Sequence, residues 1–316
     1  MAPILPSLSG LSSLIELNLR DCNLCEGDIP NDISCLSSLV MLNLSGNNFI
    51  SLPDSLTRLS KLKGLALMNC RGLKSLPELP TSVEYVSIDD CASLELIANP
   101  SKVYNRMVFM FKGINCCRLA ENINALTLLK KHLKVFANSR ERFAVIMPGS
   151  EIPEWFSHQR VDSSIKMPLP LNIRNDSQWM GVAFCCIFAG GDSSGDEQIW
   201  CDVSCRGARN LGMLYIPLGN RFNQPIKNDH LFLRYWGRDL LYPYSLKNEC
   251  GESETENTST PDCSNQECDE VELSFEYFGK GVGVKKCGVG IVYEKDLEDV
   301  QLTTEQHINQ SSPQIE

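Results

Sequence analysis

The sequence has no long apolar run, and this absence excludes one class of protein at the outset. Its longest nearly continuous apolar stretch reaches only from Val182 to Ala189, whereas a membrane-spanning helix needs roughly 20 apolar residues. The opening residues, Met1 to Pro6, include no basic residue of the kind that begins a signal peptide. We therefore expect a cytoplasmic or nuclear protein that does not contact a membrane.

Basic residues are also scarce. The chain of 316 residues holds 29 Lys and Arg against 39 Asp and Glu, a formal net charge of −10. No stretch interleaves basic with aromatic residues, so nucleic acid is not an expected partner. Histidine occurs only four times, and the pair Cys22-x-x-Cys25 has no second pair at the spacing of a zinc finger. The sequence thus predicts neither a metal site nor a cofactor.

What the sequence has instead is a pattern that occurs four times in the first hundred residues. Each copy places leucines or equivalent apolar residues at fixed steps, as in Leu14-Ile-Glu-Leu17-Asn-Leu19. The copies end at Cys22, Asn47, Cys70 and Cys91, which are separated by 25, 23 and 21 residues. Such a period predicts a leucine-rich repeat with one strand and one turn per unit. Stacked units share one core, because a single unit cannot bury its leucines alone.

Alternation within each predicted strand separates a core face from an outward face. Apolar residues at period two point inward, and the residues between them point outward. In a stack of such units the outward residues line a concave face, which in repeat proteins binds other molecules. We expect the partner-binding positions on this face to be Glu16, Asn18, Arg20, Met41, Asn43, Ser45, Met68, Tyr85, Ser87 and Asp89.

Cysteine is abundant, with fifteen residues in the chain. Three of them end copies of the repeat, and others, such as Cys185, Cys186 and Cys287, lie within apolar runs. Because the number is odd and no export signal is present, we expect reduced and largely buried thiols rather than disulfides.

The pattern changes after about Pro100, where we expect the repeats to stop. Apolar residues then recur at three- and four-residue steps from Leu119 to Phe136, which predicts one amphipathic helix. Beyond it the period becomes two, which predicts strands near 143–147, 165–171, 181–188, 199–205, 231–236, 271–277 and 288–293. Many short strands separated by turns favour a β-sandwich or jelly roll. The acidic segment from Lys247 to Glu270 predicts a solvated loop.

A motif at the start of this second half is far more specific. The consecutive residues are Pro148, Gly149, Ser150, Glu151, Ile152, Pro153, Glu154, Trp155 and Phe156. They resemble the signature of the C-terminal jelly-roll or Ig-like domain (C-JID) of plant TIR, nucleotide-binding, leucine-rich-repeat immune receptors similar to the tobacco mosaic virus resistance protein. Further matches begin at Asn115, Trp179, Asp229 and Val284, and the resemblance covers roughly residues 10 to 300.

The signature also has a simple physical interpretation, so we expect its role to be mainly structural. Pro148 and Pro153 restrict the backbone, and Gly149 permits a tight turn. The aromatic pair Trp155 and Phe156 can then pack that turn onto a sheet.

The resemblance implies the following organisation: an α/β solenoid of about four leucine-rich repeats at 1–100, a connecting helical segment at 101–140, the jelly-roll domain with its flanking helix at 141–300, and a disordered tail at 301–316. It implies a non-enzymatic recognition module that binds pathogen effector proteins and regulates receptor activation. Expected partners are an effector and the other domains or subunits of a receptor. Neither a TIR domain nor a Gly-x-x-x-x-Gly-Lys-Ser/Thr phosphate loop occurs in this sequence.

Two alternatives remain open from the residues. The segment from Glu26 to Pro30 and four Asn-x-Ser/Thr sequons suggest an exported repeat receptor fragment, which predicts disulfides and glycans. The irregular period of 21 to 25 residues speaks against it. The other alternative is a hydrolase that uses Ser193, within Gly191-Asp-Ser-Ser-Gly195. That chemistry needs a strand, a sharp turn and then a helix, whereas a strand pattern follows at Ile199.

Two further motifs match catalytic patterns only in their letters. Ser163-Ser-Ile-Lys166 leads into an alternating strand pattern and has no companion motif. Gly279-Lys-Gly-Val-Gly283 lies between two predicted strands without a following helix, so a hairpin turn is favoured over a phosphate loop. The sequence therefore predicts no catalytic residue.

Overall fold

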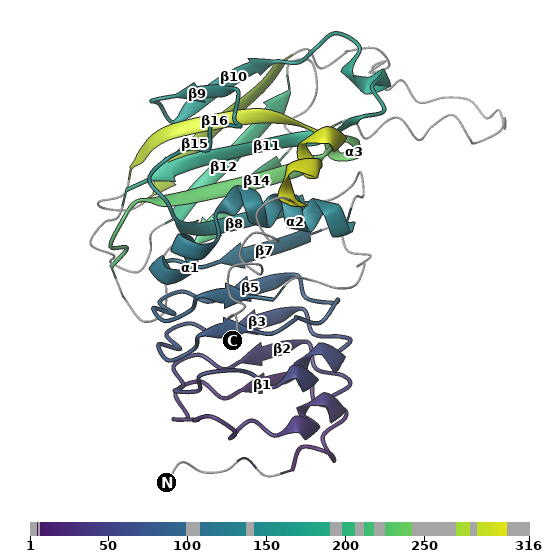
Figure 1. Cartoon of the computed structure of the whole chain (residues 1–316), viewed down its shortest axis with the longest axis vertical. Helices are drawn as coiled ribbons and strands as arrows, with labels where there is room; N and C mark the ends of the chain where they lie inside the picture. Colours follow the sequence, from purple (N-terminus) through teal and green to yellow (C-terminus); the bar gives the residue numbers. More distant parts are fainter. Residues whose placement is uncertain are drawn as a thin grey trace, which may run out of the picture.

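The computed structural model describes residues 5, 7–98, 108–136, 142–189, 198–205, 212–217, 225–241, 270–278 and 283–301. Within this part the chain is mainly β, as the sequence predicts. One ten-stranded sheet runs through the whole molecule, from the N-terminal strands to the C-terminal ones (Figure 1).

The first half of this sheet consists of short parallel strands, which we call the strand stack: β1 (Glu16–Asn18), β2 (Met41–Asn43), β3 (Gly64–Ala66), β5 (Tyr85–Ser87) and β7 (Val108–Lys112). Between strands the chain returns through the 3-10 helices η1 (Asn31–Cys35) and η2 (Asp54–Arg58) and through the two-stranded sheet of β4 (Ser75–Leu76) and β6 (Leu96–Ile97). The parallel register aligns one apolar row: Leu17, Leu42, Leu65, Val86 and Phe111.

A turn of one kind follows each strand of the stack. The backbone takes a positive φ at Asp21, Gly46, Asn69, Asp90 and Asn115, a conformation that Gly, Asn and Asp tolerate best. The fifth occurrence corrects the expectation that the pattern ends near Pro100. Strand β7 and its turn repeat the geometry, and Cys116 lies 25 residues after Cys91.

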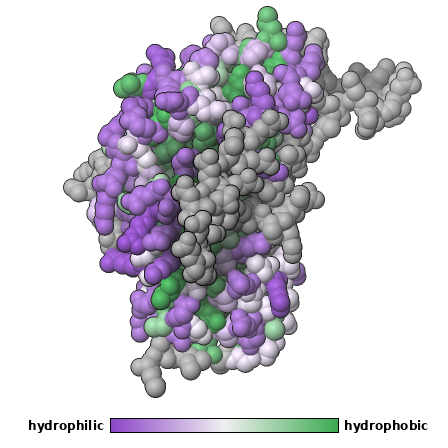
Figure 2. All heavy atoms as spheres, viewed as in Figure 1, coloured by the Kyte–Doolittle hydropathy of each residue, from purple (hydrophilic) through white to green (hydrophobic). Residues whose placement is uncertain are grey.

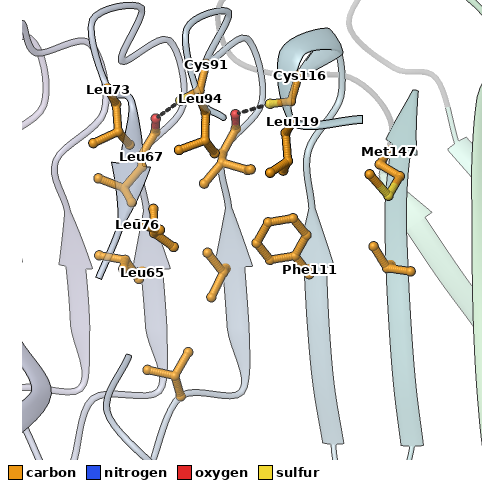
Figure 3. Packing of buried hydrophobic residues seen from close by; sticks show 14 of the residues in the cluster. Leu65, Leu67, Leu73, Leu76, Cys91, Leu94, Phe111, Cys116, Leu119 and Met147 are labelled. Atoms are coloured by element: carbon orange, nitrogen blue, oxygen red, sulfur yellow. Dashed lines mark hydrogen bonds between the residues drawn. The ribbon is translucent and has the colours of Figure 1, made fainter. Parts of the chain in front are cut away.

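From the second turn onward, the residue after the turn hydrogen-bonds to the backbone of the preceding unit, as the sequence pattern suggests. Asn47 accepts a bond from the Leu24 N–H at 2.9 Å and donates to two carbonyls. The Cys91 thiol donates to the Leu67 carbonyl at 3.0 Å, and the Cys116 thiol makes the corresponding bond one unit later, also at 3.0 Å (Figure 3). These side chains satisfy backbone groups that the ladder leaves unpaired.

Two helices follow the stack where the sequence predicts one. They are α1 (Cys117–Asn122) and α2 (Ala125–Phe136). Ile123 takes an extended conformation that ends α1, and the Asn124 side chain accepts the Thr127 N–H at 2.8 Å to begin α2. A short polar side chain that caps a helix start competes with helix continuation, and the 3.6-residue period alone does not reveal this.

The sheet continues without interruption into the second half of the chain, the C-terminal sandwich. Strand β8 (Arg142–Pro148) pairs parallel with β7, and antiparallel strands follow in the order β14 (His230–Gly237), β11 (Trp179–Phe188), β16 (Val284–Tyr293) and β9 (His158–Arg160). A four-stranded sheet packs on it, formed in order by β10 (Ser164–Pro168), β15 (Glu270–Phe278), β12 (Gln198–Cys205) and β13 (Gly212–Pro217). The remaining short helices are η3 (Ile173–Asn175), α3 (Arg238–Leu241) and η5 (Glu294–Gln301).

The large sheet has two faces with different coverings. On one face the apolar row of the stack continues into Val145, Leu233 and Cys185. The return segments, α2 and η5 cover this face (Figure 1). On the other face, residues such as Phe184 and Phe232 pack against the four-stranded sheet. The four-stranded sheet covers this face of the large sheet in the second half of the chain. The same face is more exposed toward the first strands of the stack.

Candidate partner-binding face

The open face of the stack carries three rows of side chains. Direct register across β1, β2, β3 and β5 aligns the first row, Glu16, Met41, Gly64 and Tyr85, and the second, Asn18, Asn43, Ala66 and Ser87. The third row follows the strands, where backbone bonds such as Asp21 N–H to the Ser45 carbonyl continue the ladder through Arg20, Ser45, Met68 and Asp89. The structure thus brings all ten sequence-predicted positions onto one sheet face.

Accessibility divides these ten positions. Glu16, Asn18 and Met41 are exposed, and Arg20, Asn43, Met68 and Tyr85 are half-buried. Ser45, Ser87 and Asp89 are buried, at 0%, 1% and 0% exposure, so three of the ten predicted positions are not open to a partner. Outward orientation does not guarantee exposure: the Ser45 hydroxyl accepts the Met68 N–H, and Ser87 and Asp89 lie beside the buried Lys112.

The centre of the face is apolar, and its residues have small side chains or none. A Cβ built on Gly64 would lie 2.5 Å from the Met41 sulfur, so the Met41 side chain lies across the Gly64 backbone. Ala66 adds only a methyl group beside it, and Met41 remains 43% exposed. Methionine is flexible and polarizable, and it adapts to partners of different shape. Figure 2 shows the other side of the molecule, the side of α2 and η5, where apolar residues form small groups among hydrophilic ones.

Several polar side chains of the face also bond to its own backbone. Asn18 Oδ1 accepts the Arg20 N–H, and Asn43 Oδ1 accepts the Ser45 N–H, both at 3.1 Å. The Ser45 hydroxyl accepts the Met68 N–H at 3.1 Å. These bonds fix the turns after the strands, so Ser45 is better placed to hold the turn than to contact a partner.

A buried ion pair closes the face at its C-terminal end. Lys112 Nζ lies 3.1 Å from Asp89 Oδ2, and both side chains are at most 4% exposed. Asp89 also accepts the Ile114 N–H at 2.9 Å and the Ser87 hydroxyl at 3.3 Å. Burial raises the pKa of the Asp89 carboxyl, and the Lys112 charge opposes that rise. The pair therefore links strand β5 to β7 at the point where the sandwich begins.

A second polar network ties the last turn of the stack to the sandwich. The Asn115 N–H donates to His230 Nε2 at 2.9 Å, and its side chain donates to Asp90 Oδ1 and accepts the Lys227 N–H. His230 Nδ1 bonds to the Asn228 carbonyl at 2.8 Å. This arrangement requires a neutral ring with its proton on Nδ1, and burial lowers the pKa of His230 to about 4.

The signature residues pack on the covered face of the sheet. Trp155 and Phe156 meet edge to face with ring centroids 5.0 Å apart, and a Cβ on Gly290 would lie 3.0 Å from the Trp155 ring. Ile152 is similarly close to Gly288, 3.1 Å from a Cβ built there. Both glycines belong to β16, so the motif fits a strand that lacks side chains at these two positions.

The rest of the motif forms the turn itself. The Phe156 N–H donates to the Pro153 carbonyl at 3.0 Å, and Gly149 lies against Leu231. Glu151 pairs with Lys286 at 3.0 Å, whereas Glu154 and Ser150 are exposed. Pro148 ends β8. These contacts agree with a mainly structural role for the signature.

Of the three motifs that match catalytic patterns in their letters, the structure describes one in full. Ser163 directly precedes the alternating strand β10, as expected. Ser193 and most of the segment from Gly279 to Gly283 lie outside the described residues. Among the residues that the structure describes, no group of three His, Cys, Asp or Glu side chains could hold a metal ion, and no helix is long and apolar enough to cross a membrane. The cysteines whose side chains are described are free.

Sequence reasoning missed the residues that join the two halves: Lys112, Asn115 and His230. The pattern Ile114-Asn115-Cys116 did contain a signal, because it matches the end of the earlier copies and lies 25 residues after the last one. His230 had no such signal, since its bond to Asn115 joins residues 115 positions apart in the sequence.

Comparison with known proteins agrees with this geometry. Residues 147–298 match the C-JID domain family. The chain carries a C-JID domain. It is 29% identical to "Disease resistance-like protein DSC1" of Arabidopsis thaliana, over 98% of this chain and 27% of that protein. "TMV resistance protein N" of Nicotiana glutinosa is 36% identical over 57% of this chain and 16% of its own length.

A third relative, "Disease resistance protein RPS4B" of Arabidopsis thaliana, is 26% identical over 93% of this chain and 26% of its own length. The chain is therefore homologous over most of its length to TIR, nucleotide-binding, leucine-rich-repeat disease resistance proteins of plants, which confirms the resemblance seen in the sequence. It spans about a quarter or less of the length of these three relatives.

Proposed function

We propose that this chain is a recognition module of a plant intracellular immune receptor, and that the strand stack is a leucine-rich-repeat array whose open face binds a pathogen effector protein. The names of the relatives support a role in disease resistance. The observation that carries the choice of surface is the accessible set Met41, Met68 and Tyr85 around the apolar centre at Gly64. A few apolar and aromatic anchors supply most of the affinity at such interfaces.

The C-JID sandwich completes the proposed module. Its large sheet is continuous with the stack, and the Asp89–Lys112 and Asn115–His230 contacts connect the two. Binding at the open face would therefore act on a sheet that continues into the sandwich, with no linker between the two. We propose that the remaining partners are other domains or subunits of a receptor, which respond when the effector binds.

The test of the binding face compares matched variants against a library of secreted pathogen proteins expressed with the chain. Tyr85→Ala and Met41→Ser change the open face, and Lys61→Ala changes an exposed residue outside it. A pathogen protein that binds the wild-type chain should lose at least 1 kcal/mol of binding energy with one of the face variants. It should keep its affinity for the Lys61→Ala variant. Transfer of specificity with the sandwich alone, while both face variants bind normally, would move the site off the stack.

A further inference from the structure

A positively charged side chain lies between the two sheets of the C-terminal sandwich without a counter-charge among the described residues. Arg234 is only 5% exposed, and along β14 it stands between Phe232 and Trp236 on the face that packs against the four-stranded sheet. Its guanidinium carbon lies 4.5 Å from the centroid of the Trp236 ring. A guanidinium in this position has lost nearly all of its contact with water.

The partners of Arg234 do not compensate for that loss. Its polar neighbour is the Cys201 thiol of the facing sheet, and burial raises the pKa of that thiol to about 12, so the sulfur is neutral. The Nη1 atom of Arg234 is buried without a hydrogen-bond partner. Burial lowers the pKa of Arg234 only to about 10, so the group keeps its charge at neutral pH. A cation–π contact offsets only part of the cost of a buried charge.

A second unpartnered donor lies beside the first. Trp236 is 1% exposed, and its indole Nε1 has no hydrogen-bond partner. Arg142, which is exposed, lies over the same ring with its guanidinium carbon 5.8 Å from the centroid. Arg142 is the register partner of Trp236 at the first residue of β8. Two cations and one indole N–H without a partner therefore lie together at this end of the sandwich. Arg142 lies between the buried residues, Arg234 and Trp236, and the solvent.

We propose that Arg234 and Trp236 form a binding site for an oxyanion, a carboxylate or phosphate group, with Arg142 at its entrance. The guanidinium and the indole N–H are both donors, so only an acceptor satisfies them. A negatively charged acceptor also neutralises the buried charge. The site lies on the sandwich and does not depend on the proposed binding face of the stack.

The test follows the indole N–H signals of the full chain in proton–nitrogen NMR spectra, where the four tryptophans give four indole resonances. The Trp236 signal is assigned with Trp236→Phe. Inorganic phosphate and acetate are titrated separately, with sodium chloride at equal ionic strength as the reference. We expect a saturable downfield shift of the Trp236 signal and a constant Trp179 signal, because Trp179 Nε1 already donates to the Gly181 carbonyl at 2.9 Å.

The matched variant is Arg234→Met, which keeps an unbranched apolar stem and removes the charge. It should abolish the shift while the Trp179 signal shows that the fold is intact. A response to phosphate alone supports a phosphate group as the ligand, and a response to acetate supports a carboxylate such as an acidic side chain. If the variant does not fold, the wild-type titration decides. No saturable shift beyond that with chloride, or an unchanged shift in Arg234→Met, overturns the proposal.

Discussion

The strand stack and the C-terminal sandwich share one sheet, yet they cover it differently. In the stack the strands β1, β2, β3 and β5 are three residues long and one face is open toward β1. In the sandwich β14 is buried at all eight positions and β11 at nine of ten, because helices lie on one face and a second sheet on the other. The difference shows that an open face arises where a continuous sheet loses one of its two covers.

The largest expected effect concerns the border between these regions. Asp89→Ala should lower the free energy of unfolding by about 3 to 5 kcal/mol, because it leaves Lys112 buried without its partner. Denaturant unfolding measures the change. The matched control is Asp89→Leu combined with Lys112→Met, which removes both charges and should recover most of the loss. Equal destabilisation by the single and double variants would contradict a role for the ion pair.

A comparable effect is expected inside the sandwich. Phe156 is 2% exposed and packs with Trp155 against β16, so Phe156→Ala should cost about 3 to 4 kcal/mol through the cavity it leaves. The control, Glu154→Ala, changes an exposed residue of the same motif and should stay within about 0.5 kcal/mol. Thermal and denaturant unfolding check both. A mild Phe156→Ala would mean that the signature has a role other than packing.

Acid should act outside the strand stack, because the stack contains no histidine. Burial lowers the pKa of His230 to about 4 and that of His132 to about 3, against 6.5 for the free group. The unfolded chain therefore takes up protons first, and stability falls as the pH drops from about 6.5 toward 4. The loss from His230 alone is roughly 3 kcal/mol. His230→Gln should flatten part of this pH dependence; an unchanged profile would show that His230 is not buried as described.

Within the stack, two residues at equivalent positions should differ in importance. Asn47→Ala removes bonds to the Leu24 N–H and to two carbonyls, so we expect a loss of about 2 to 3 kcal/mol. Cys91→Ala removes one thiol donor and should cost about 1 kcal/mol. Cys91→Ser keeps a donor and serves as the control. If Asn47→Ala and Cys91→Ala cost the same, the number of backbone bonds does not set the stability of the turn.

The smallest effect is expected on the open face. Met41→Ala should change stability by about 0.5 kcal/mol or less, because the side chain is 43% exposed and lies over Gly64 rather than in the core. Leu42→Ala, one residue away on the covered face and 1% exposed, should cost about 3 kcal/mol. Equal losses for these neighbours, measured by denaturant unfolding, would mean that the face is covered in solution.

The sequence by itself determined the mainly β class, the alternation that separates the two faces of each strand, and most strands of the sandwich. It did so because period-two and repeat patterns report local burial, which each residue type carries with it. The ten predicted face residues share one face of the sheet, and seven of them are at least partly exposed. The break between α1 and α2, strands β9 and β13, and the fifth turn at Asn115 were missed, because short strands and a polar cap leave weak patterns.

Only the tertiary structure decided which outward positions are open. Ser87 and Asp89 follow the same alternation as Asn18 and Arg20, yet they are buried beside strand β7 and its residue Lys112. The same holds for Arg234, a charged residue in a strand whose neighbours are all buried. Local pattern records the direction of a side chain, whereas exposure depends on what distant segments pack against it.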